Sequence, residues 1–315
     1  MFALRGIAVS LSVFLIVYCA ASLAVVCTWN RVYQRVHDFP MQRLANLFFA
    51  FRIFPLALAA LITAAFAVPS FLLLEPRSIV EPMGNVPLAL ALFGSGLAIF
   101  GLANAVLAVR KASRTVSSWT NSAEEIASPV PFPVMRIRRR VPALTAAGIL
   151  RPKILLSGSA EFLLNGNELR TALNHELAHI RRRDNFKKLL LRFVAFPGMR
   201  GLETAWLEAS EMAADDAAVS STADALDLAA ALLKLSRLKA DEPSPDLSAA
   251  LVHGHAAIIN ARVERLISWP ERPESSLDLS AKSILGVVLP ILALFAITYG
   301  WLLADVHRAT EWLIR

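Results

Sequence analysis

Long uninterrupted apolar stretches constrain this chain more than any other feature of its sequence. Three of them lie in the first third, at residues 6–27, 54–74 and 86–109, and a fourth lies at residues 283–304. Each is long enough to cross about 30 Å of hydrocarbon as a helix. The chain is 56% hydrophobic and only 18% charged, which is outside the usual range for a soluble domain. The sequence therefore predicts four transmembrane helices.

The segment between the third and fourth stretches, residues 111–282, carries most of the charge and predicts a folded domain of about 170 residues. Residues 1–110 then hold three membrane helices, and residues 305–315 form a short external tail. The first stretch could instead be a signal peptide, but its apolar run is longer than such peptides usually have, which favours a retained helix. The expected fold class is a mainly α membrane protein with an α+β domain inserted between helices three and four.

Lys and Arg in the short loops predict the orientation of these helices. The loop after the first helix, residues 28–43, has three Arg against one Asp, whereas residues 75–85 have one Arg against two Glu. Further basic residues, at 110, 111 and 114, follow the third helix directly. The first loop and the inserted domain are therefore predicted to be cytoplasmic, and both chain termini external.

The net charge of +7 could indicate either nucleic-acid binding or attraction to anionic lipid headgroups. Much of the positive charge lies beside the predicted membrane helices and in "RIRRR", residues 136–140. With this much hydrocarbon-compatible sequence, membrane lipids are the favoured partner and no direct nucleic-acid contact is expected. A nucleic-acid-binding membrane protein would instead bind DNA with a steep dependence on salt.

The stretch "TALNHELAHIRRRDN", residues 171–185, is expected to be helical. Apolar residues recur every three or four positions between residues 167 and 183, and either Asn165 or Asn167 is placed to cap the start of the helix. An HExxH pattern on a helix places its two histidines one turn apart on the same face.

These histidines, His175 and His179, can both reach one Zn²⁺ at about 2 Å, and Glu176 lies beside them to activate a water molecule. The pattern therefore predicts a catalytic zinc site. The alternative is an ordinary helix face that carries two incidental histidines.

A catalytic zinc site needs a third protein ligand, and an acidic helix at residues 201–220 offers one. Glu211 is the favoured ligand, because Asp215 follows one turn later on the same face and can accept the free ring N–H of His175. Glu208 is the alternative ligand. Small apolar neighbours indicate close packing of this helix, although a solvated acidic face would also explain its carboxylates.

A strand is expected at residues 153–156, between Pro152 and "SG". Its residues Ile154, Leu155 and Leu156 could bind an extended peptide by backbone pairing at the rim of the site, or they could form a core strand with no ligand role.

Two further histidines lie in the predicted domain, at positions 253 and 255. His255 is retained as a candidate to stabilise the oxyanion, while the simpler interpretation makes both of them loop residues.

The chain resembles the BlaR/MecR-type membrane zinc metallopeptidases of the gluzincin group in its helix plan and in three local pieces, "GILRPKILLS", "NHELAHIRRRDN" and "EMAADDAAV". HExxH alone is shared by many metallopeptidases. The resemblance becomes more specific because Gly-x-x-x-Pro-x-Ile precedes the motif, Arg-Arg-x-Asp follows it and Glu-x-x-Ala-Asp completes it.

This resemblance implies a cytoplasmic zincin-like metallopeptidase domain in a bacterial inner membrane. It implies the zinc ligands His175, His179 and Glu211, the general base Glu176, and Asp215 as the partner of a ligand. The family's best-known members carry an extracellular β-lactam-sensing domain after the fourth helix and relieve repression by a cytoplasmic repressor. Only residues 305–315 follow that helix here, so the antibiotic-sensing role is not expected.

The leading hypothesis is thus a membrane zinc endopeptidase that cleaves a cytoplasmic transcriptional repressor or a membrane protein at the cytoplasmic face, in regulatory proteolysis or signalling. A looser resemblance to HtpX-type endopeptidases favours membrane-protein quality control instead. A hypothesis of another class is a non-catalytic membrane sensor or scaffold with a structural or regulatory metal. A closed structural zinc site usually includes Cys, and both Cys lie outside the predicted domain, which argues against that hypothesis.

Overall fold

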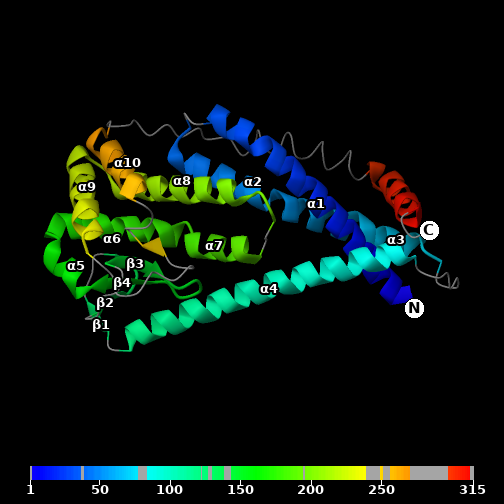
Figure 1. Ribbon diagram of the computed structural model, residues 1–315, viewed down its shortest axis with the longest axis horizontal. Helices are drawn as coiled ribbons and strands as arrows, with labels where there is room; N and C mark the ends of the chain where they lie inside the picture. The colour runs from blue at the N-terminus through cyan, green and yellow to red at the C-terminus, as the bar shows by residue number, and fades with distance from the viewer. Residues whose placement is uncertain are drawn as a thin grey trace. The chain divides into compact units, whose positions relative to one another are not determined.

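Helices dominate the computed structural model of the protein (Figure 1). The structure describes residues 2–36, 39–76, 84–121, 123–126, 130–137, 143–193, 196–238, 249–250, 256–269 and 297–312. The mainly α character expected from the sequence is confirmed. Residues 283–296 of the fourth predicted membrane helix lie outside the described residues. Its remaining residues, 297–304, belong to a helix over residues 297–312.

In the part of the chain that the structure describes, three helical segments are long and apolar enough to cross a membrane. The first is α1 (Phe2–Val36), and the third is α4 (Asn85–Thr120). The second runs continuously from Met41 to Leu74 through α2 (Met41–Ile62), the π-helical turn η1 (Thr63–Ala67) and α3 (Val68–Leu74).

These helices extend well beyond the predicted spans. α1 continues to Val36, the second segment begins at Met41, and α4 ends at Thr120. The prediction of a loop over residues 28–43 is therefore wrong for most of its length. The reason is physical: an apolar run marks the part of a helix that hydrocarbon can cover, whereas Arg and Gln continue a helix equally well in water.

The π-helical turn in the second segment lies just before a proline. Pro69 has no N–H to donate to the carbonyl of Ala65, and a ring at this position crowds that carbonyl in an α-helix. The Ala65 carbonyl accepts a hydrogen bond from the hydroxyl of Tyr299 at 2.7 Å instead. A side chain from the helix over 297–312 thus satisfies the backbone group that the proline leaves.

The chain divides into two compact units. Unit 1 comprises Met1–Thr28, Ile53–Phe100 and Arg272–Arg315, and unit 2 comprises Trp29–Arg52 and Gly101–Glu271. Most of the predicted domain at residues 111–282 falls in unit 2, which also takes in parts of the long helices. All residues of the candidate site that the structure describes lie in unit 2.

A small mixed sheet forms one layer of unit 2. Its strands are β1 (Glu124–Ile126), β2 (Val134–Ile137), β3 (Leu144–Ala147), β4 (Lys153–Ser157) and β5 (Ala249–Ala250), in the order β1-β2-β4-β3-β5. Only β2 and β4 are parallel, and the other pairs are antiparallel. In β4, Ile154 lies opposite Val134 on one side and Ala146 on the other.

Six helices complete the described part of unit 2 after the sheet begins. They are α5 (Gly158–Leu163), α6 (Gly166–Arg181), α7 (Asp184–Phe193), α8 (Arg200–Ala218), α9 (Thr222–Ser236) and α10 (Ala256–Ile267). Asn165 caps α6: its side chain accepts from the Glu168 backbone N–H, and the Glu168 carboxylate accepts from the Asn165 N–H, each at 2.9 Å. Of the two predicted caps, Asn165 is confirmed.

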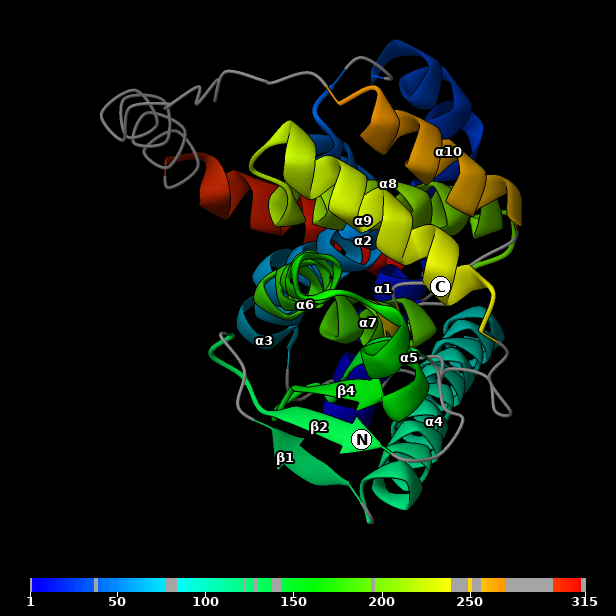
Figure 2. The ribbon, with the colours of Figure 1, turned by 90° about the vertical axis from the view of Figure 1, so that its left-hand side faces the viewer.

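α6 is the central helix of unit 2. Figure 2 shows it between the sheet on one side and α8 and α9 on the other. Its buried Leu173 and Leu177 pack into a core with Ile154 and Leu156 of β4 and Leu232 of α9. A helix buried on two sides holds its polar residues in fixed positions, which is what a metal site requires.

Within unit 2, residues of α2 hold α8 in place. Arg52 of α2 is 1% exposed and donates to Oε1 of Glu203 from Nε at 3.0 Å and from Nη2 at 2.8 Å. The ring of Phe49 lies 5.9 Å from that of Trp206, centroid to centroid. These contacts fix the helix that carries Glu211.

Candidate metal centre

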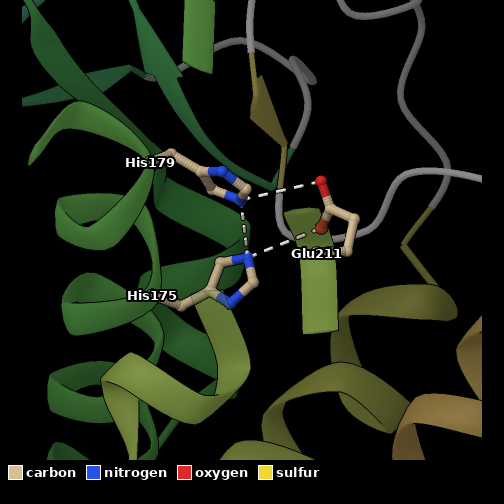
Figure 3. A group of neighbouring side chains, drawn as sticks. All are labelled: His175, His179 and Glu211. Carbon is tan, nitrogen blue, oxygen red and sulfur yellow. Dashed lines mark hydrogen bonds and ion pairs between the residues drawn. The ribbon is translucent and has the colours of Figure 1, made fainter. Parts of the chain in front are cut away.

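Three side chains from two helices meet in the interior of unit 2 (Figure 3). The Nε2 atoms of His175 and His179, both on α6, lie 3.1 Å apart. Glu211 of α8 places Oε2 at 3.6 Å from Nε2 of His175, and Oε1 at 3.6 Å from Nε2 of His179. All three residues are buried, so the group could hold a metal ion out of contact with bulk solvent.

The spacing of these atoms fits a single small ion. In a tetrahedral site with bonds of about 2.0–2.1 Å, two ligand atoms lie roughly 3.3 Å apart. The observed 3.1 Å and 3.6 Å lie on either side of that value. Two imidazole nitrogens and one carboxylate also match the ligand preferences of zinc and related divalent ions.

A carboxylate lies behind each histidine. Oδ1 of Asp215 is 2.9 Å from Nδ1 of His175, at an angle poor for a hydrogen bond, and Oδ2 of Asp184 is 2.8 Å from Nδ1 of His179. Such partners fix the tautomer and ring orientation of metal-binding histidines, with Nε2 left to face the ion. The pairing of Asp215 with His175 is the one expected from the sequence, while Asp184 was not foreseen as a partner.

Asp184 reaches His179 because the chain turns sharply after α6. The helix ends at Arg181, and Arg183 has a φ of 54°, in the left-handed region. This turn brings Asp184 back against the helix, where it also accepts from Ser210 of α8 at 3.0 Å. The sequence signal was the acid five residues after His179, but a straight helix would have carried it away from the ring.

Arg262 of α10 is the second residue that the sequence did not indicate. Its guanidinium donates to both carboxylate oxygens of Asp215, at 2.7 and 2.8 Å, and its Nη1 lies 3.2 Å from Oε2 of Glu211. Arg262 follows Asp215 by 47 positions and lies on a helix with one other basic residue, Arg265. No spacing rule connects residues that distant in the sequence.

Glu176 is held against the sheet beside the two histidines. Its Oε2 accepts a hydrogen bond from the backbone N–H of Ala146 in β3 at 2.6 Å. No donor among the described residues reaches its Oε1, although the side chain is completely buried. Burial raises the pKa of Glu176, which outweighs the opposing effect of the nearby histidines. A carboxyl group with a raised pKa and one free oxygen is suited to accept a proton.

Neighbouring charges set the pKa values of His179 and Glu211. Burial lowers the pKa of His179, but the charge of Glu211 and the contact with Asp184 outweigh it and raise this pKa to about 9. Burial raises the pKa of Glu211, yet the histidines and Arg262 hold it well below its usual range. The positive charge of the protonated His179 ring thus offsets the negative charge of one carboxylate. A divalent cation bound in place of that proton would offset it in the same way.

Asp184 and Asp215 are held as carboxylates by their neighbours. Burial alone would raise both pKa values. The contact with His179 brings the pKa of Asp184 down to about 2, and the charge of Arg262 holds the pKa of Asp215 far below its usual range.

The remaining candidates from the sequence do not join this group. Glu208, the alternative ligand, is half-buried on α8 and is not among the three clustered residues. The expectation that Ile154, Leu155 and Leu156 pair with a peptide is wrong, because β4 is flanked by β2 on one edge and β3 on the other. His253 and His255 lie outside the described residues.

A cavity of about 400 Å³ lies along a different face of α6. Asn174, Ala178 and Arg181 line it, and the three clustered residues do not. It is therefore separate from the metal centre. Comparison of the chain with protein-family models and with curated proteins found no match.

Proposed function

We propose that the protein is an integral membrane zinc endopeptidase. The observation that carries this proposal is the approach of His175, His179 and Glu211 to within ligand spacing of one ion, with the Glu176 carboxylate next to them. Each part has a counterpart in zinc peptidase chemistry, which uses two histidines and a glutamate as ligands and a second glutamate as base.

Zinc is the proposed ion because its usual ligands are imidazole nitrogen, carboxylate oxygen and thiolate. Three protein ligands leave a fourth position for water or substrate, which distinguishes catalytic from structural zinc sites. When bound, the ion supplies Lewis acidity: it polarises a carbonyl group and lowers the pKa of water toward about 7.

Glu176 is the proposed general base. Its Oε1, which has no donor among the described residues, accepts a proton from the attacking water and returns it to the leaving amine. The hydrogen bond from the Ala146 N–H to Oε2 keeps the carboxylate directed toward the histidines. Asp215 and Asp184 hold the two imidazoles with Nε2 toward the ion.

The proposed location is a bacterial inner membrane, with the metal centre on the cytoplasmic side. Three helices long and apolar enough to span a bilayer support the membrane assignment, and the Lys and Arg of the flanking segments support the orientation. The local sequence pieces that resemble BlaR/MecR-type peptidases favour a protein substrate such as a cytoplasmic repressor, or a membrane protein in the manner of HtpX.

β3 replaces β4 as the strand best placed to bind a peptide. It contacts α6, the backbone N–H of its Ala146 donates to Glu176, and among the described residues its outer edge pairs only with the short strand β5, opposite Thr145 and Ala146. An extended peptide aligned on β3 would therefore pass next to the metal centre.

A structural or regulatory metal site is the second candidate function, and the burial of the centre favours it. His175 and Glu176 are 0% exposed, and His179 and Glu211 are 3% and 7% exposed. A site this enclosed admits an ion readily, while a peptide requires the surrounding segments to open.

Replacement of Glu176 by Gln separates the two functions. The amide keeps an oxygen for the Ala146 N–H but cannot accept a proton, so proteolysis should fall by about 10²–10⁴-fold while metal content stays unchanged. The readout compares full-length proteins lost from cells that express the wild type, Glu176→Gln or the control Glu208→Gln, with metal content measured on the purified proteins. Equal cleavage by the Glu176→Gln protein would refute the peptidase mechanism.

A further inference from the structure

Arg262 is the only described basic side chain that contacts both acids of α8 at the metal centre. Its Nε and Nη2 donate to Oδ2 and Oδ1 of Asp215 at 2.8 and 2.7 Å, which is a two-point contact with a carboxylate. Its Nη1 lies 3.2 Å from Oε2 of Glu211. One guanidinium group therefore spans the two acids, and each of these acids faces His175.

The position of Arg262 in the fold makes this contact rigid. The side chain is 0% exposed, and its helix α10 buries Ile259, Val263 and Leu266 in the main core of unit 2. Burial of a guanidinium is unfavourable unless its donors are satisfied by acceptors. Asp215 and Glu211 supply them, so the three groups stay together or the core is disrupted.

The contact distinguishes the two oxygens of Glu211. Both oxygens lie 3.6 Å from a histidine Nε2, Oε2 from that of His175 and Oε1 from that of His179, but only Oε2 also lies 3.2 Å from Nη1 of Arg262. A carboxylate with one oxygen engaged by a guanidinium has one oxygen left to bind an ion strongly. A ligand that binds through a single oxygen also leaves room for a water molecule at the ion, as a catalytic site requires.

We propose that Arg262 is a positioning residue of the metal centre. It holds Glu211 so that this carboxylate binds the metal through Oε1 and not through Oε2. It also holds Asp215 against Nδ1 of His175. The proposal rests on the proposed function only to the extent that the centre binds a divalent metal, and it does not require that the protein cleave peptides.

Lysine at position 262 is the informative replacement. It keeps the positive charge next to two buried carboxylates, so the charge balance of the core is retained. It cannot make a planar two-point contact with Asp215 and reach Glu211 as well. A residue that serves only to neutralise charge tolerates Arg262→Lys, whereas a positioning residue does not.

The test compares Arg262→Lys with Arg265→Lys in the full-length protein. Arg265 lies on the same helix and pairs with Asp216, next to Asp215 in sequence but outside the metal centre, which makes it a matched control. Zinc affinity is measured by competition with a chelating dye. Cobalt is then substituted, because its visible absorption reports the number and geometry of its ligands.

We expect Arg262→Lys to weaken zinc binding by about 10–100-fold and to change the cobalt spectrum, with circular dichroism unaltered. Arg265→Lys should bind zinc within about threefold of wild type. Wild-type affinity and spectrum in Arg262→Lys would overturn the proposal.

If Arg262→Lys does not fold, Arg262→Gln replaces it, since its amide keeps a donor for Asp215 but cannot span to Glu211 as well. A folded Arg262→Gln protein with wild-type zinc affinity overturns the proposal as well, and an affinity about 10–100-fold weaker supports it. No peptide is involved in these measurements. If the protein proved not to cleave peptides, the result on zinc affinity would therefore still hold. If Arg262→Lys bound zinc as the wild type does, the Glu176→Gln test of proteolysis would still hold.

Discussion

Among the described residues, each of the two units contains one group of histidine and carboxylate side chains at metal-binding spacing, and the two groups differ in burial and in the surroundings of their histidines. In unit 2 the group is His175, His179 and Glu211, and in unit 1 it is Glu75, His307 and Glu311. In each, the candidate ligand atoms lie within 4.8 Å of one another. The first group is buried, whereas the second is partly exposed, with the Glu311 side chain 45% accessible.

The surroundings of the histidines differ more than their exposure. In unit 2, oxygens of Asp215 and Asp184 lie 2.9 and 2.8 Å from the Nδ1 atoms, whereas the acid paired with His307 in unit 1, Glu311, faces its Nε2 at 3.5 Å. In unit 1, Glu75 forms an ion pair with Arg5 at 3.0 Å, and in unit 2 Glu211 likewise lies 3.2 Å from Arg262, so a neighbouring arginine does not distinguish the groups. Ligand spacing alone therefore does not define a metal site. The carboxylates that orient the ligand histidines distinguish the two groups.

Removal of a ligand from the unit 2 group should have the largest effect. A zinc site releases about 10–16 kcal/mol, so each of three or four ligands accounts for roughly 3–4 kcal/mol, or a 10²–10³-fold change in affinity. We expect His179→Ala to lose its metal on dialysis. The metal content of the purified protein, measured by mass spectrometry, checks this, and one retained equivalent would show that the ion binds elsewhere.

Removal of a supporting carboxylate should have an intermediate effect. Asp184→Asn keeps the shape of the side chain but loses the charge that orients His179, so zinc affinity should fall by about 10–100-fold. Competition with a chelating dye measures the change. Asp305→Asn is the control, because Asp305 is an exposed acid of unit 1 paired with Arg308. An equal effect of both replacements would mean that Asp184 acts through net charge and not through His179.

The unit 1 group should show no effect at all. The double replacement His307→Ala with Glu311→Gln is expected to leave metal content at the wild-type value, because no described carboxylate lies against Nδ1 of His307 to orient the ring. Metal analysis of this protein beside His179→Ala completes the comparison. A loss of one equivalent from the double variant would show that spacing suffices without support.

The sequence predicted the parts of the centre that follow from helix periodicity. His175 and His179 share a face because they are four residues apart, and the same spacing relates Glu211 to Asp215 on α8. The capping residue Asn165 was among the two predicted because N-terminal capping depends on a few neighbouring residues. These are local relations, which a single sequence expresses directly.

The parts that were missed depend on tertiary structure. Asp184 reaches His179 only because Arg183 adopts a positive φ, and Arg262 reaches Asp215 only because α10 packs on α9. The order of the strands was missed for the same reason. Residues 153–156 form a strand as expected, but only the pairing of β2 and β3 with it shows that both of its edges are occupied.

The candidate ligands come from two helices that are separated in the chain. His179 ends the contribution of α6 and Glu211 begins that of α8, with all of α7 between them in the chain. An ion held by both helices would act as a crosslink that closes a loop of roughly thirty residues, and crosslinks of this kind stabilise a fold by restricting its unfolded chain. The metal would then stabilise the fold as well as take part in the chemistry. The stability of this unit would therefore depend on the concentration of free metal around it.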